Sequence, residues 1–246
     1  MLISAMVGID SRATMDIDTT LRNYPLNCES AEQIVRQIAD VEIDDKISFV
    51  IKKTEEIMED SEYQGVRLSL DAYLDKTRIP LKIDISTGDV ITPCEISFSY
   101  QLMFENRTIP LLAYPPETVL AEKLETILSR GEANTRLRDF YDVYILQRED
   151  FVVTPDALCH ALLATCRKRR HEDLLHTYAS ILNEVRQSGA MRAQWMKYQT
   201  DFDYAAGITW DTVLDTVETL CMKTLDDHAF GDELPQEESQ FEMHLL

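Results

Sequence analysis

Hydrophobic and polar residues alternate with a period of two through most of the first 114 residues, which is the pattern of strands with one buried face. The expected strands lie in the runs ATMDIDTTL, ISFVIKKTEEI, VRLSLDAYLD, IPLKIDIST, ISFSYQLMF and RTIPLLAY. One helix interrupts them, SAEQIVRQIADV. We expect Ser30 or Glu29 to cap it, and Ile34, Val35 and Ile38 to form its apolar face.

After Pro115 and Pro116 the hydrophobic period becomes helical. The expected helices are 116–130, 135–147, 154–169, 173–187, 191–202 and 209–225, with Gly131 ending the first. The pattern predicts an α+β fold, with a mixed sheet core and flanking helices in 1–114 and an all-helical region in 115–227. Residues 228–246 are acidic and contain neither lysine nor arginine, which predicts a disordered tail.

The net charge of -20 argues against a protein that coats nucleic acid without specificity. The densest group of cations is the basic cluster, Arg167 to His171. It is either a solvated helix end that complements the helix dipole or a local contact for RNA.

The five cysteines form no C-x-x-C pair, and no apolar run is long enough to cross a bilayer. With no signal peptide, these features predict a reduced, cytoplasmic protein without membrane contact.

Candidate chemistry begins with Asp16 and Asp18, which flank a single isoleucine in an expected strand. Residues two apart in a strand point to the same face, so these carboxylates would lie side by side and repel each other. Asp84, in IPLKIDIST, would join them if its strand is a neighbour. Three carboxylates form a site suited to Mg²⁺, which would remove the repulsion. The chain has no glycine-rich phosphate loop and no spaced Cys/His set for zinc.

Two further charges lie in or beside apolar helix faces. Lys123 lies on the flank of the apolar stripe of helix 116–130. Either its stem covers apolar surface while the ammonium reaches solvent, or the ammonium is aimed at nucleotide phosphates. Asp139 lies on a face that looks buried and needs a partner, which Lys123 or a substrate group could supply. Arg138 and Asp142 have the spacing of an exposed i,i+4 pair, which predicts a structural role for Asp142.

The runs RATMDID, LKIDIS and YPPETVLAEKLETILSRGEANTRLRDFYDVYIL resemble the AbiEii/AbiGii toxin family of nucleotidyltransferases, associated with abortive-infection and toxin–antitoxin systems of bacteria. The resemblance covers residues 2–146. It implies a nucleotidyltransferase sheet-and-helix core followed by a helical region. The implied activity is Mg²⁺-dependent transfer of a nucleoside monophosphate from an NTP to RNA, including tRNA, and the implied protein partner is a cognate antitoxin.

The resemblance also implies roles for individual residues. The family's Ser/Thr-x-Asp-x-Asp element falls on Thr14, Asp16 and Asp18, its helical lysine on Lys123, and the aspartate of its Arg-Asp element on Asp139. Asp16 and Asp18 would then hold the metal, with Asp84 in the place of a third strand carboxylate. Thr14 and Lys123 would bind the nucleotide, and Asp139 would position Lys123 or the nucleotide.

One departure from the family pattern lies at the start of the chain. Family members have a strand and a Gly-Gly or Gly-Ser turn before the first helix, and this turn holds the triphosphate. Here the chain opens at MLISAMVG, which reads like the helix after that turn, as expected for an internal start or a truncated copy. Two alternatives therefore stay open: a catalytically impaired relative that binds a partner through its helical half, or a metal-dependent phosphohydrolase that uses the same carboxylates.

Overall fold

The computed structural model describes residues 2–8, 10–12, 14, 16–43, 46–59, 63–102, 105–148 and 153–226 of the chain. At positions 16, 58, 59, 63 and 64 it describes the backbone but not the side chain. The expected acidic tail, 228–246, lies outside the described residues.

The six expected strands are all present, in two sheets. The strands are β1 (Asp16–Leu21), β2 (Ile47–Glu59), β3 (Tyr63–Leu74), β4 (Thr77–Thr87), β5 (Ile96–Gln101) and β6 (Thr108–Ala113). The first four form a sheet in the order β1-β4-β3-β2, in which β1 runs parallel to β4 and the other pairs are antiparallel. The last two strands form a separate antiparallel pair. The strand that carries Asp16 and Asp18 is therefore at one edge of a mixed sheet.

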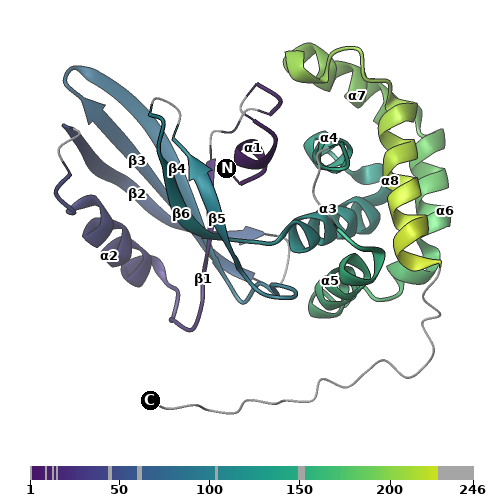
Figure 1. Cartoon of the computed structure of the whole chain (residues 1–246), viewed down its shortest axis with the longest axis horizontal. Helices are drawn as coiled ribbons and strands as arrows, with labels where there is room; N and C mark the ends of the chain where they lie inside the picture. The colour runs from purple at the N-terminus through teal and green to yellow at the C-terminus, as the bar shows by residue number, and fades with distance from the viewer. Residues whose placement is uncertain are drawn as a thin grey trace.

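Helix α2 (Cys28–Ala39) packs on one face of the four-stranded sheet (Figure 1). Its cap is Asn27, whose Oδ1 accepts from the backbone N–H of Ser30 at 2.8 Å, so the expected caps at Ser30 or Glu29 were wrong. The helix meets the sheet through Ala31 and Val35, one turn apart. Ile38, expected on the apolar face, is instead 67% exposed, because the contact stripe follows residues 31 and 35.

The remaining helices match the expected ranges to within two residues at each end. They are α3 (Pro116–Arg130), α4 (Leu137–Leu146), α5 (Pro155–Lys168), α6 (Leu174–Gln187), α7 (Gly189–Asp201) and α8 (Trp210–Leu225). Gly131 ends α3 with a φ of 50°, a left-handed conformation that favours glycine. These helices pack around one hydrophobic core. Within the described residues, none of the helices combines the length and hydropathy needed to cross a membrane.

The first helix, α1 (Leu2–Val7), packs with the helical region although it precedes the sheet in sequence. Its Ile3 and Val7 join the core formed by α3 to α8. In space, α1 lies between the four-stranded sheet and α4 (Figure 1). The chain therefore enters β1 directly from the helical core. The division at residue 114 stays a prediction.

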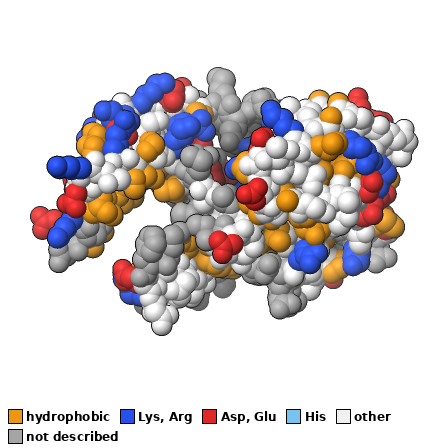
Figure 2. All heavy atoms as spheres, turned by 90° about the horizontal axis from the view of Figure 1, so that it is seen from above, with side chains coloured by type: hydrophobic (Ala, Val, Ile, Leu, Met, Phe, Trp, Pro, Cys, Tyr) orange, Lys and Arg blue, Asp and Glu red, His pale blue; other side chains and the backbone are white. Residues whose placement is uncertain are grey.

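The sheet is covered by α2 over only part of its length. Figure 2 shows hydrophobic side chains gathered on the lobe at the left of the view, which contains the four-stranded sheet and α2. The exposed apolar residues at this end of the sheet and helix are Ile38, Val41, Ile43, Ile47, Phe49, Val50, Leu74 and Ile79.

Candidate functional site

Asp18 of β1 lies on the sheet face opposite α2. Leu21 packs in the sheet core under α2, so residues 18 and 20 of the same strand point to the other face. The Asp18 side chain is exposed and, among the residues that the structure describes, makes no hydrogen bond or ion pair. The side chain of Asp16, two residues earlier in the strand, is not described. Asp18 pairs in register with Asp84 of β4, so the expected neighbouring strand is present.

Asp84 differs from Asp18 because its charge is already compensated. Arg67, opposite it on β3, donates from Nε to Oδ1 at 2.7 Å and from Nη2 to Oδ2 at 2.5 Å. The Asp84 side chain is 14% exposed. Among the described residues, no three Asp, Glu, His or Cys side chains are grouped as a metal site. Because the Asp16 side chain is not among those described, the expected trio of Asp16, Asp18 and Asp84 stays a prediction.

Lys123 of α3 and Asp139 of α4 form an ion pair. Lys123 Nζ lies 2.6 Å from Asp139 Oδ1 and 3.4 Å from Asp142 Oδ2. The Lys123 side chain is 23% exposed and that of Asp139 is 6% exposed. Burial disfavours the charged amine, but the two carboxylates outweigh it and hold the pKa of Lys123 above its ordinary value. Lys123 is therefore a cation at neutral pH, and part of its side chain still reaches solvent.

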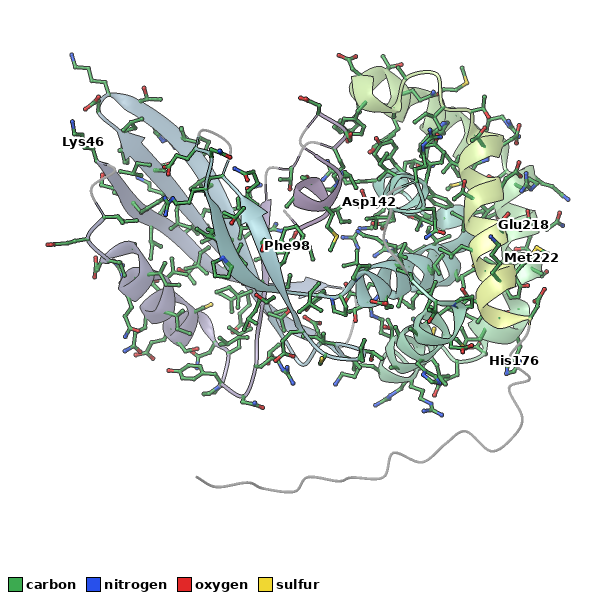
Figure 3. All side chains as sticks on the ribbon, viewed as in Figure 1. Lys46, Phe98, Asp142, His176, Glu218 and Met222 are labelled. Atoms are coloured by element: carbon green, nitrogen blue, oxygen red, sulfur yellow. The ribbon has the colours of Figure 1, made fainter. Side chains whose placement is uncertain are left out.

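The expectation for Asp142 was wrong, because this residue is not an exposed partner of Arg138. Its side chain is fully buried where α4 lies beside α1 (Figure 3). Arg12 donates to both of its oxygens, from Nε at 2.9 Å and from Nη2 at 3.1 Å. Arg138 instead lies over the Phe202 ring, 5.6 Å from its centroid. Asp139 and Asp142, one turn apart, thus belong to one buried network that links α1, α3 and α4.

The strand β1 is tethered at both ends to the segments that carry this network. Before the strand, the Tyr141 hydroxyl of α4 donates to the carbonyl of Ser11 at 2.5 Å. At the far end, Thr20 donates to Asp89, and the hydroxyl of Tyr114 donates to the same carboxylate at 2.8 Å. Tyr114 immediately precedes the two prolines that open α3. Both tethers fix β1 relative to the helices of Lys123 and Asp139.

The structure joins some of the expected site residues and leaves others apart. Within the described residues, no ion pair or hydrogen bond joins Asp18 to Lys123, and Thr14 is half-buried. Sequence reasoning missed Arg12, although it opens the run RATMDID, and misassigned Asp142. The sequence did contain a signal that Asp142 is buried with Asp139, because it follows Asp139 by one helical turn in an otherwise apolar segment.

Part of the basic cluster is directed inward. Arg169 and His171 both contact Glu125 of α3, with His171 Nδ1 at 2.6 Å from Glu125 Oε1. The Glu125 side chain is buried. Arg169 therefore neutralises a buried carboxylate and His171 lies within hydrogen-bond distance of it, which neither of the two expectations for the cluster included.

Comparisons with known proteins place the chain in a family. No curated protein matches its sequence. Among solved structures, a "putative nucleotidyltransferase from H. pylori" is 12% identical, with 92% of this chain and 95% of that chain covered and a TM-score of 0.37. JHP933 from Helicobacter pylori is 13% identical, with 92% and 91% covered and a TM-score of 0.36. A family model described as "Nucleotidyl transferase AbiEii toxin, Type IV TA system" matches residues 1–216. Because this match spans most of the chain, the protein belongs to the AbiEii family of nucleotidyltransferase toxins, as the resemblance of its motifs predicts.

Proposed function

We propose that this chain is a Mg²⁺-dependent nucleotidyltransferase that moves a nucleoside monophosphate from an NTP to an RNA acceptor and acts with a cognate antitoxin. Membership of the AbiEii family supports nucleotidyl transfer and an antitoxin partner at the level of the family. The observation that carries the residue assignment is Asp18, an exposed carboxylate on an edge strand with no partner among the described residues. Asp16 lies two residues earlier in the same strand.

The carboxylates fit a magnesium ion. Mg²⁺ usually takes one or two protein carboxylates and fills its other positions with water and substrate phosphates. Asp16 and Asp18 supply that number, whereas both oxygens of Asp84 are held by Arg67. Asp16 and Asp18 would hold the ion, which would supply Lewis-acid stabilisation of phosphate charge.

The network around Lys123 supplies positive charge for the phosphates. Arg12 and Lys123 balance Asp139 and Asp142, and Arg136 Nε, 3.9 Å from Asp139, adds a third cation. The excess of one positive charge favours an anion at the exposed part of Lys123. Asp139 holds the Lys123 ammonium in place through the 2.6 Å contact. Thr14, with a hydroxyl two residues before Asp16, would donate a hydrogen bond to the nucleotide.

The test is RNA labelling from radioactive NTP in the presence and absence of Mg²⁺. We expect Asp18→Asn to lower labelling more than about 100-fold, because even the outer partners of metal ligands are typically worth 10- to 100-fold. Asp75→Asn is the control, since Asp75 is exposed in the β3–β4 turn, with a left-handed φ of 52° that asparagine accepts.

Labelling by Asp18→Asn at the wild-type rate, or labelling that needs no Mg²⁺, would contradict the proposal. NTP hydrolysis that requires Asp18 but leaves RNA unlabelled would identify a phosphohydrolase instead. Retained antitoxin binding with neither reaction would favour the protein-binding alternative.

A further inference from the structure

The segment that leads into β1 is fastened to α4 by a buried ion pair between residues 130 positions apart. Asp142 has no exposed side-chain surface and Arg12 has 8%. The two parallel contacts, at 2.9 and 3.1 Å, use the planar fork of the guanidinium, which fixes direction as well as distance. Arg12 Nη1 also lies 3.4 Å from Ser4 Oγ of α1. The pair therefore holds α1, the entry to β1 and α4 in one arrangement.

The same carboxylate also contacts Lys123. Asp142 Oδ2 accepts from Arg12 at 3.1 Å and lies 3.4 Å from Lys123 Nζ. A shift of Asp142 would therefore move the cation proposed to meet the phosphates and the anchor of the strand that carries Asp16 and Asp18.

The anchor is close to the strand in sequence. Four peptide units separate Arg12 from Asp16, and a fully extended chain spans at most about 3.6 Å per residue, or roughly 14 Å. The other end of β1 is held through Thr20 and Asp89. The backbone of β1, with Asp18 in its middle, thus runs between two held points.

We infer that Arg12 and Asp142 form a latch that sets the position of the β1 carboxylates relative to Lys123, which makes both of them positioning residues for nucleotidyl transfer. This inference rests on the proposed function. Stability alone gives little reason for the pair, since apolar side chains of similar volume often stabilise a core as well as a buried ion pair does. A positioning role uses a property that apolar side chains lack, namely hydrogen bonds of fixed direction between the two side chains.

The experiment compares Asp142→Asn and Arg12→Lys with Glu125→Gln. Glu125 is a matched control, because it is a buried carboxylate of α3, two residues from Lys123, with an arginine and a histidine as partners outside the latch. Each variant is studied at a temperature where circular dichroism shows that it is folded. We expect Asp142→Asn to lower kcat by about 10- to 100-fold with KM for the NTP little changed, since a misplacement of about 1 Å can cost 100-fold.

Two further readouts distinguish positioning from a purely structural role. Asp142→Asn removes one of the two carboxylates that raise the pKa of Lys123, so the alkaline limb of the rate profile should move to lower pH, and in Glu125→Gln it should not. Arg12→Lys keeps the charge but loses the fork, so its kcat should fall between those of the wild type and Asp142→Asn. Amide hydrogen exchange in residues 16–21 should accelerate in Asp142→Asn and stay unchanged in Glu125→Gln.

The latch is overturned if Asp142→Asn keeps both the wild-type kcat and the slow exchange of β1, or if Glu125→Gln matches its losses. Asp18→Asn separates this failure from failure of the proposed function. If Asp18→Asn is inactive while Asp142→Asn is fully active, only the latch is wrong. If both variants are fully active, the proposed function is wrong as well, and the hydrogen-exchange result still decides whether the pair holds β1.

Discussion

Replacing Lys123 by methionine tests how far the buried network depends on the cation that contacts both of its carboxylates. Methionine keeps most of the length and apolar contact of the lysine stem and removes only the charge. Asp142 retains Arg12, but Asp139, whose side chain is 6% exposed, keeps only Arg136 at 3.9 Å. The variant therefore leaves one carboxylate almost without compensation in a buried position.

The magnitude follows from that imbalance. Removing one partner of a buried ion pair typically costs about 3 to 5 kcal/mol. Because Lys123 is 23% exposed and Arg136 remains near Asp139, we expect the lower end of the range, about 3 kcal/mol. For a chain of this length, each kcal/mol lowers Tm by about 2 to 4 °C, so the expected fall is about 6 to 12 °C.

The decisive assay is a double-variant cycle in urea and thermal unfolding. Lys123→Met combined with Asp139→Asn has no uncompensated carboxylate and should recover about 2 kcal/mol relative to Lys123→Met alone. RNA labelling should stay lost in both, since the phosphate-binding cation is gone. Lys197→Met, at an exposed position of α7, is the control and should change stability by less than about 0.5 kcal/mol. If the double variant is no more stable than Lys123→Met, the two side chains are not coupled and the reasoning fails.

Three further predictions concern the rest of the molecule. Asp84→Asn should lower RNA labelling by no more than about 10-fold, far less than Asp18→Asn, because an arginine already holds the Asp84 carboxylate. Burial raises the pKa of the Cys166 and Cys221 thiols from 9.0 to about 12, so their contribution to stability is full below pH 9 and is lost as pH rises toward 12. In that window each thiol should lower the free energy of unfolding by about 1.4 kcal/mol per pH unit. Urea unfolding should therefore show a smaller loss of stability between pH 8 and pH 10 in Cys221→Ala than in the wild type. Changing Arg167, Lys168 and Arg170 together to alanine should reduce the salt dependence of RNA labelling without loss of Tm, whereas Arg169→Ala should lower Tm. Equal salt slopes for the triple variant and the wild type would exclude an RNA contact there.

The sequence by itself determined the elements and their order. Period-two alternation marked every strand of both sheets, and helical periodicity marked α3 to α8, because both patterns depend on which side of a local segment meets the core. The end of α3 at Gly131 was readable for the same reason, since a left-handed residue is a local requirement. The shared face expected for Asp16 and Asp18 stays a prediction, because the Asp16 side chain is not among those described.

Only the tertiary structure decided which charges meet. The i,i+4 rule paired Asp142 with Arg138, but α1 covers that part of α4 and brings Arg12 to Asp142 from 130 residues away. In the same way, Arg169 and His171 reach Glu125 across more than 40 residues, although in sequence they look like a solvated helix end. A buried charge takes whichever opposite charge the packing brings within about 3 Å, because leaving it unpaired costs more than any local preference gains.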